Sequence, residues 1–163
     1  MSNQTSSLEF SHFPVMLNEV LQLSSPSYKK NFIDCTFGGG GDSKEILKFP
    51  NTNIQAIDRD EKASLIAKEF VSKFPKRFKF YKTKFSQMDI FAKDNVDVII
   101  FDLGLSSIQL NDFDRGFSFN SNKKLKMTMG LNDVSAIEAL NNLSETDLKL
   151  VIKILGDERE ASK

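Results

Sequence analysis

Hydrophobic residues recur along the first part of the chain in alternating strand-like and helix-like periods. Helical spacing, with apolar residues three and four positions apart, occurs at 13–23, 42–49 and 61–74. Short apolar or alternating runs typical of strands occur at 31–37, 54–58 and 77–85. A continuous apolar run at 96–103, rich in β-branched residues, predicts a fourth strand that is covered on both faces. Strands that alternate with helices predict an α/β fold with a parallel sheet.

The pattern changes after the fourth predicted strand. The stretch 103–132 has no clear period, and a connection longer than about 12–15 residues is usually functional or disordered. Helical spacing returns at 135–140 and, behind a Ser144–Asp147 pair with the spacing of a capping box, at 148–155. The polar residues 1–11 predict a disordered tail.

Composition narrows the function classes. A length of 163 residues is typical of one domain. The 22 Lys and Arg residues balance the 22 Asp and Glu residues, so the chain has no overall positive charge to attract nucleic acid. Nucleic acid would therefore have to bind through a local basic patch. Cys35 is the only cysteine, which excludes disulfides within the chain and metal sites with several cysteine ligands. His12 is the only histidine, which excludes metal sites with two histidine ligands. We therefore expect no metal. No apolar run is long enough to span a membrane, and the first residues lack a secretory signal, so we expect a cytoplasmic protein.

The strongest local signal is a glycine-rich loop between a predicted strand and a predicted helix. The segment FIDCTFGGGGDS allows backbone N–H groups to approach a ligand, and the next strand ends at Asp58, 18 residues after Gly40. An acid at that place can accept hydrogen bonds from ribose hydroxyl groups. The plainer alternative is a tight turn with a surface aspartate.

The loop is a poor match to a nicotinamide dinucleotide. The pattern GxGxxG/A fails at its last position, which is Ser43. Asp34 and Asp42 flank the loop, where carboxylates would repel a pyrophosphate. These two acids suit a ligand that carries an amino group and a sulfonium, which is S-adenosylmethionine. A nicotinamide-dependent reductase is therefore disfavoured.

A second candidate site follows the fourth predicted strand, at Asp102. Ligands of open α/β sheets lie outside the carboxyl ends of the strands. A carboxylate there could accept the proton of an amine that is about to be methylated. An exocyclic base amine needs such help, because its lone pair is delocalised into the ring. The alternative is that Asp102 caps the next helix.

Two further segments are compatible with nucleic acid. In the long irregular stretch, Arg115, Phe117 and Phe119 suit a nucleotide extruded from its stack, although phenylalanines that pin a loop to the core give the same pattern. The stretch 73–85 interleaves basic and aromatic residues like an RNA-binding surface. Lysines on an edge strand, where they prevent aggregation, explain that stretch more simply.

Taken together, the motifs resemble one family. HFPVMLNEVL, FIDCTFGGGGDS, AIDRD, FDLGLSS and RGFSF occur in the order and approximate spacing of the bacterial-type 16S ribosomal RNA (cytosine-N4)-methyltransferases, the MraW/RsmH type. The resemblance runs from about residue 12 to the end of the chain. It implies a Rossmann-like, class I S-adenosylmethionine-dependent methyltransferase fold. It also implies methyl transfer from S-adenosylmethionine to N4 of a cytidine in the decoding region of small-subunit rRNA, as RNA or in the assembled subunit.

The same resemblance assigns residues by position. The cofactor contacts that it implies are Gly40, Gly41, Asp42, Asp58, Phe85, Asp102 and Gln109. The catalytic residues that it implies are Asp102, Ser106 and Ser107. The candidates for contact with RNA are Arg115, Phe117 and Phe119. In domain terms, we expect a partial Rossmann-like core at 12–110, followed at 111–163 by an active-site loop and the beginning of a helical substrate-recognition insert.

The sequence also departs from the family's usual pattern. Asp42 replaces a histidine, Ile108 a proline, and Lys126, Thr128 and Gly130 replace an acid, an arginine and an acid. The family is about twice as long, so we expect an incomplete sheet of about four strands, with the fourth at an open edge. Such an edge predicts a homodimer, or pairing with a polypeptide that supplies the second half. A non-catalytic module that retains S-adenosylmethionine or RNA binding is the alternative function.

Overall fold

The computed structural model describes residues 15–92, 95–131 and 134–161. The predicted tail at 1–11, together with His12 and Pro14, lies outside the described residues. The chain divides into two compact units, one that ends at Asn111 and one that begins at Asp112. The first unit holds the sheet, and the second is built around short helices.

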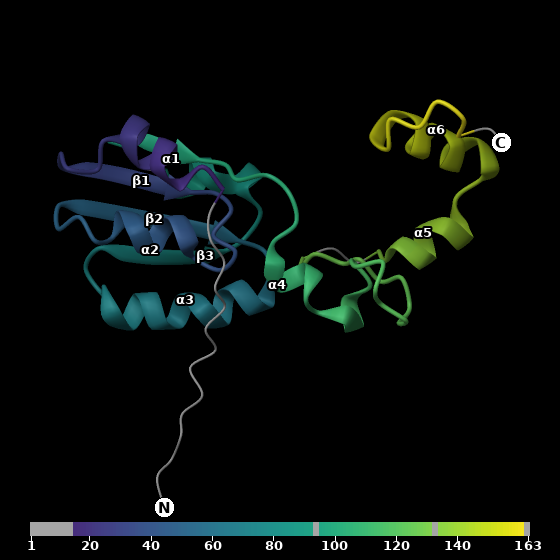
Figure 1. Cartoon of the computed structure of the whole chain (residues 1–163), viewed down its shortest axis with the longest axis horizontal. Helices are drawn as coiled ribbons and strands as arrows, with labels where there is room; N and C mark the ends of the chain where they lie inside the picture. The colour runs from purple at the N-terminus through teal and green to yellow at the C-terminus, as the bar shows by residue number, and fades with distance from the viewer. Residues whose placement is uncertain (1–14, 93–94, 132–133, 162–163) are drawn as a thin grey trace, which may run out of the picture. The chain divides into compact units, whose positions relative to one another are not determined.

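Four strands form the sheet of the first unit (Figure 1). They are β1 (Lys30–Asp34), β2 (Thr52–Asp58), β3 (Phe78–Lys82) and β4 (Val98–Ile100). Their order is β3-β2-β1-β4, so β1 and β2 are central and β3 and β4 lie at the edges. Each neighbouring pair is parallel. The predicted α/β fold with a parallel, four-stranded sheet is confirmed.

Three helices pack against one face of this sheet: α1 (Leu17–Ser24), α2 (Gly41–Ile46) and α3 (Glu61–Lys73). Phe32, Ile54 and Phe78 lie in register on neighbouring strands and are buried beneath the helices. The rings of Phe37 and Phe70 meet edge to face, with centroids 5.2 Å apart. Burial of these side chains, at about 25 cal/mol per Å² of apolar surface, holds the helices to the sheet.

Arg77, 30 residues after Leu47, binds carbonyl groups that follow the end of α2. Its guanidinium group donates hydrogen bonds to the carbonyl oxygens of Leu47 (2.9 Å) and Phe49 (2.8 Å), and a longer one to that of Thr52 (3.4 Å). Carbonyl groups at the end of a helix have no N–H partner within the helix. The residue that precedes β3 therefore fixes the connection between α2 and β2.

The opposite face of the sheet is covered near the carboxyl ends of its strands. Ile33, Cys35 and Ile57 are buried there, against side chains of the 3-10 helix η1 (Phe85–Ile90) and of the segment after it. Toward the amino ends of the strands a cavity of about 560 Å³ opens. Its polar lining consists of Asn31, Asn53, Gln55, Lys76, Arg77 and Lys79.

Three predicted strands are shorter in the structure, and the first of them, β1, ends at Asp34 instead of residue 37. β4 covers Val98–Ile100 instead of 96–103, because it pairs with β1 alone and β1 ends at Asp34, opposite Ile100. β3 ends at Lys82 instead of residue 85, where η1 begins. The expectation that the fourth strand is covered on both faces is wrong for the described chain, since Ile99 is 43% exposed at the sheet edge. The interpretation of 73–85 as an edge strand is confirmed by the position of β3.

A short helix, α4 (Ser107–Leu110), ends the first unit. The second unit contains the 3-10 helix η2 (Phe113–Arg115) and the helices α5 (Ala136–Asn142) and α6 (Glu145–Leu155), none of whose residues is buried. Ser144 caps α6 by accepting the backbone N–H of Asp147 at 3.1 Å, as the sequence predicts. Ser135, predicted as the first residue of a helix, is instead the N-cap of α5. No helix in the described part of the chain is long and apolar enough to cross a membrane.

Candidate functional site

The carboxyl ends of β1, β2 and β4 meet around the glycine loop. The backbone N–H of Gly38 donates to the Oδ2 atom of Asp58, at the end of β2 (2.7 Å). The backbone N–H of Asp102, beyond β4, donates to the hydroxyl oxygen of Thr36, beyond β1 (2.8 Å). A Cβ atom placed on Gly38 would lie 3.7 Å from the Cβ atom of Ser106. The sheet therefore brings the glycine loop and the segment after β4, two separate predictions from the sequence, into one place.

The core beneath the glycine loop also shapes it. Gly38 and Gly40 have φ angles of +50° and +76°, in the left-handed region that favours glycine. A Cβ atom on Gly40 would lie 2.7 Å from an atom of the Phe70 ring and 2.8 Å from an atom of the Phe37 ring. Close packing therefore requires glycine at position 40, independently of any ligand.

Asp34 supports the loop from the protein interior. Its buried carboxyl group accepts the hydroxyl of Ser43 (2.6 Å) and the backbone N–H of Thr36 (3.2 Å). Burial raises the pKa of Asp34 to about 7. Asp34 is only 2% exposed, so the structure gives no support to the prediction that it suits the amino group of a ligand. Gly41 and Asp42 form the first turn of α2, where they are half-buried.

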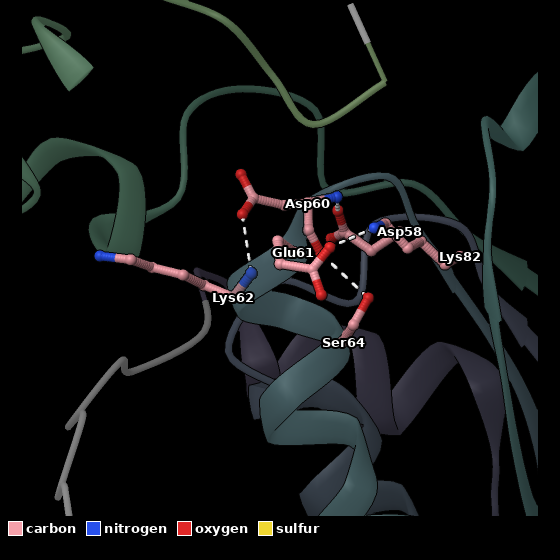
Figure 2. Close-up of polar contacts among 6 residues, drawn as sticks. All are labelled: Asp58, Asp60, Glu61, Lys62, Ser64 and Lys82. Atoms are coloured by element: carbon pink, nitrogen blue, oxygen red, sulfur yellow. Dashed lines mark hydrogen bonds and ion pairs between the residues drawn. The ribbon is translucent and has the colours of Figure 1, made fainter.

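Asp58 joins the glycine loop to the start of α3. Its Oδ2 atom accepts the N–H of Gly38, and its Oδ1 atom accepts the N–H of Asp60 at 2.8 Å. Burial raises the pKa of the Asp58 carboxyl, and these hydrogen bonds oppose that effect. Asp60 is the N-cap of α3 and accepts the backbone N–H of Lys62 at 3.0 Å, while the hydroxyl of Ser64 donates to its carbonyl oxygen at 3.2 Å (Figure 2).

Asp102 is exposed and does not cap the helix that follows it. α4 begins at Ser107, and its N-cap is Ser106, whose side chain is part of a capping box. The alternative interpretation, in which Asp102 caps the next helix, is therefore wrong. Phe85, another predicted cofactor contact, is 43% exposed and meets the ring of Phe101 edge to face, with centroids 5.5 Å apart.

Gln109 is buried, and both ends of its amide bind protein groups. Its Oε1 atom accepts the backbone N–H of Ser106 (3.0 Å), and its Nε2 atom donates to the Oδ2 atom of Asp60 (3.2 Å). Sequence reasoning missed both Asp60 and Thr36. A signal existed for Asp60, since an aspartate directly before a helical pattern favours the N-cap position. No local pattern distinguishes Thr36.

The predicted RNA contacts lie in the second unit. The guanidinium group of Arg115 donates to the carbonyl oxygen of Thr128 (2.7 Å) and lies 5.2 Å from the centre of the Phe117 ring. Phe119 is fully exposed, so it does not pin the loop to a core. The N–H of Met127 donates to the carbonyl oxygen of Arg115 (2.8 Å). This bond brings part of the segment that departs from the family's pattern beside RGFSF.

The groups gathered in the first unit are oxygen acceptors and backbone donors. Within residues 15–92, 95–131 and 134–161, no group of three or more His, Cys, Asp or Glu side chains is placed to hold a metal ion. Asp58 ends β2, and Asp102 lies two residues beyond the end of β4 in the same parallel sheet. Residues 9–163 match the MraW methylase family. The chain belongs to this family.

Two relatives of this MraW methylase family chain show how far the similarity extends. Ribosomal RNA small subunit methyltransferase H of Ehrlichia canis (strain Jake) is 39% identical over 157 residues, which cover 93% of this chain and 53% of that protein. The protein of the same name from Rickettsia massiliae (strain Mtu5) is 44% identical over 151 residues, which cover 91% of this chain and 48% of that protein. The chain therefore spans about half the length of the curated relatives that it matches.

A solved structure, an rRNA methylase from Streptococcus thermophilus, superposes on 71% of this chain and 69% of its own. The TM-score is 0.48 and the sequence identity 15%. The family match confirms the resemblance to the MraW type that the motifs indicate.

Proposed function

We propose that this chain binds S-adenosylmethionine and takes part in methyl transfer to N4 of a cytidine in the decoding region of small-subunit (16S) rRNA. The hydrogen bond from Gly38 to Asp58 carries the proposal, since it fixes an acid beside a glycine loop at the carboxyl edge of a parallel sheet. Membership of a methylase family supports the reaction class. The name of the relatives, ribosomal RNA small subunit methyltransferase H, supports the substrate class.

The residues at the loop fit S-adenosylmethionine better than a dinucleotide. Asp42 and Asp58 lie close enough to Asp34 to raise its pKa further, so a pyrophosphate would meet several carboxyl groups here. S-adenosylmethionine supplies an electrophilic methyl group on a positively charged sulfonium, which such a site favours. The carboxylate of Asp58 would accept hydrogen bonds from the ribose hydroxyls. The other proposed cofactor contacts are Gly40, Gly41, Asp42, Phe85, Asp102 and Gln109.

Asp102 is the proposed proton acceptor. Its side chain is exposed, while its backbone is held to the end of β1 by the 2.8 Å bond to Thr36. During transfer the cytidine nitrogen gains a bond to the methyl carbon and loses a proton, and the carboxylate would orient the amine and take that proton. Ser106 and Ser107, which cap and begin α4, would hold the segment that carries Asp102.

On the RNA side, residues 111–163 are the proposed active-site loop and the beginning of a substrate-recognition insert, with residues 12–110 as the core. The exposed ring of Phe119 could stack on an unpaired base. Arg115 and Phe117, in contact with each other, would support that loop or meet the RNA backbone. The proposed partner is small-subunit rRNA or the assembled small subunit, which places the reaction in the cytoplasm.

A second proposed partner is a polypeptide at the open sheet edge. Among the residues that the structure describes, no strand pairs with the outer side of β4, and Ile99 and Phe101 are 43% and 44% exposed. Natural proteins rarely leave such an apolar edge uncovered. We propose that a second copy of the chain, or a polypeptide equivalent to the remaining length of the relatives, covers it.

Calorimetric titration with S-adenosylhomocysteine tests the cofactor assignment. Asp58→Ala should weaken binding by about 1–3 kcal/mol, because it removes charge-assisted hydrogen bonds to the ribose. Glu69→Ala, which removes an exposed acid of α3, is the matched control and should bind like the wild type. Equal affinities for wild type and Asp58→Ala would remove Asp58 from the site. Tighter binding of NAD than of S-adenosylhomocysteine would overturn the cofactor itself.

The alternative is a non-catalytic module that retains S-adenosylmethionine or RNA binding. The observation that favours it is the contact between Met127 and Arg115, which places the altered positions Lys126 and Thr128 next to the proposed RNA loop. Single-turnover methylation of small-subunit RNA or of partly assembled subunits separates the two functions. Cofactor binding together with methyl transfer supports the enzyme, whereas cofactor binding without transfer supports the module.

A further inference from the structure

A closed set of contacts links the glycine loop to the segment after β4. The N–H of Gly38 donates to Asp58, and the N–H of Asp60 donates to the other oxygen of the same carboxylate. Asp60 in turn accepts the side-chain amide of Gln109, whose Oε1 atom accepts the N–H of Ser106. Ser106 lies against Gly38, since a Cβ atom at position 38 would be 3.7 Å from the Cβ atom of Ser106. Each member therefore constrains the next.

The bond between Asp60 and Gln109 is the long-range connection in this set. The two residues are 49 positions apart, and both side chains are buried, at 5% and 8% exposure. A buried polar group that loses its partner destabilises its surroundings more than an exposed one does. α4 has four residues, and a helix of that length is not stable without tertiary contacts. α4 therefore needs tertiary contacts, and these include the buried side chain of Ile108 and the bond from Gln109 to Asp60.

We propose that Asp60 is a positioning residue: through Gln109 it holds the segment that carries Asp102, Ser106 and Ser107 in place relative to Asp58 and the glycine loop. This inference rests on the proposed function, in which Asp58 meets the cofactor and Asp102 the amine. The same carboxylate caps α3 by accepting the N–H of Lys62. One buried side chain thus sets the spacing between the cofactor and the accepting amine.

Substitutions that exchange the donor and the acceptor separate the effect of the bond between Gln109 and Asp60 from that of the other contacts of these residues. In Asp60→Asn the side-chain oxygen can still cap α3, since Asn is as good an N-cap as Asp, but an NH2 group then faces the NH2 group of Gln109. In Gln109→Glu two carboxylates face each other. The double variant restores one donor and one acceptor with the direction reversed. Glu69→Gln, an exposed acid on α3, is the matched control.

Hydrogen exchange in the ligand-free chain is the first measurement. The N–H groups of Gln109, Leu110 and Asn111 bind carbonyl groups at the start of α4 and report its order. Asp60→Asn and Gln109→Glu should each speed their exchange by about tenfold, and the double variant should return it to within about threefold of the wild type. Unchanged exchange in Asp60→Asn, or effects that add in the double variant, would overturn the proposal.

Affinity for S-adenosylhomocysteine is the second measurement. Asp60→Asn should bind it several-fold more weakly, with no change in Glu69→Gln. Affinity is not compared in the variants at Gln109, because Gln109 is itself a proposed cofactor contact. An Asp60→Asn variant that binds like the wild type would overturn the positioning role, even if α4 is less ordered. A wild-type chain that binds no S-adenosylhomocysteine refutes the proposed function instead, and the exchange result still decides whether Asp60 positions α4.

Discussion

The hydroxyl group of Ser43 donates a hydrogen bond of 2.6 Å to the buried carboxyl group of Asp34. Ser43 lies in the first helical turn after the glycine loop, and Asp34 ends the strand before it. The carboxyl also accepts the N–H of Thr36. The two sides of the loop are therefore tied together by one acid that is not among the proposed ligand contacts.

Stability should depend on pH through Asp34. Burial raises its pKa from 3.8 to about 7, so between these values the folded chain holds a proton that the unfolded chain has lost. The free energy of unfolding should therefore fall as pH rises from about 4 to about 7 and level off above. Urea unfolding at pH 5 and pH 8 measures this change. Relative to Asp34→Asn, the wild type should lose on the order of 2 kcal/mol over that range.

Asp58 also has a raised pKa and is present in both proteins, so its own burial cancels in the difference, while its repulsion with Asp34 remains as part of the effect assigned to Asp34. Ser43→Ala is a second check. It removes a hydrogen bond that lowers the pKa of Asp34, so the loss of stability should extend to higher pH. A difference between wild type and Asp34→Asn that does not change with pH would contradict the assignment.

Alanine at Gly40 should destabilise the fold more than alanine at Gly38. Both glycines have left-handed φ angles, so both variants incur a conformational cost of about 1 kcal/mol. Only at Gly40 does the new methyl group also overlap aromatic rings, at 2.7 and 2.8 Å. Thermal or urea unfolding should show an additional loss of about 1–3 kcal/mol for Gly40→Ala. Equal stabilities would mean that Phe37 and Phe70 move aside.

Asp102→Ala should reduce methyl transfer far more than cofactor affinity. The proposed carboxylate orients the amine and accepts its proton, effects that operate in the transition state and amount to about 10²–10⁴-fold in rate. Single-turnover methylation and titration with S-adenosylhomocysteine measure the two quantities on the same variant. Glu69→Ala should change neither. Proportional losses of rate and affinity would make Asp102 a residue that only positions the cofactor.

Self-association should involve the open edge of β4. Light scattering over a concentration series should show an increase in mass, and Ile99→Lys should abolish it, because a charge on an edge strand opposes pairing. Leu65→Lys is the control, since Leu65 is 53% exposed on α3, away from the edge. Slow hydrogen exchange at Ile99 and Ile100 would accompany pairing. A monomer at all concentrations with rapid exchange in β4 would refute self-association.

The local elements of the first unit could be predicted because their signals are local. The helix predicted at 61–74 is observed as Glu61–Lys73, between an aspartate N-cap and the proline after Phe74. The interior position of Asp34 was not predicted, although Phe32 and Asp34, two positions apart on a strand, point to the same buried face. The limits of β4 depend on where β1 ends, which no pattern within 96–103 contains.

The candidate site also has some parts that local sequence predicts and others that it does not. The glycine loop, Asp58 and Asp102 follow from residue type and position at strand ends, and the structure brings their segments together. The link between Gln109 and Asp60 joins residues 49 positions apart and could not be read from either local segment. Gln109 matches a family motif by position, but that motif does not reveal that both ends of its amide are held by the protein.

The guanidinium group of Arg77 has a consequence for the order in which the chain can fold during its synthesis. Arg77 follows Leu47 by 30 positions, and until it is made the carbonyl groups of Leu47, the C-cap of α2, and of Phe49 lack this partner. A nascent chain that has been synthesised only as far as β2 therefore contains α2 but lacks the guanidinium group that binds the carbonyl groups after it. α2, β2, α3 and the start of β3 should become stable together, as one step of vectorial folding.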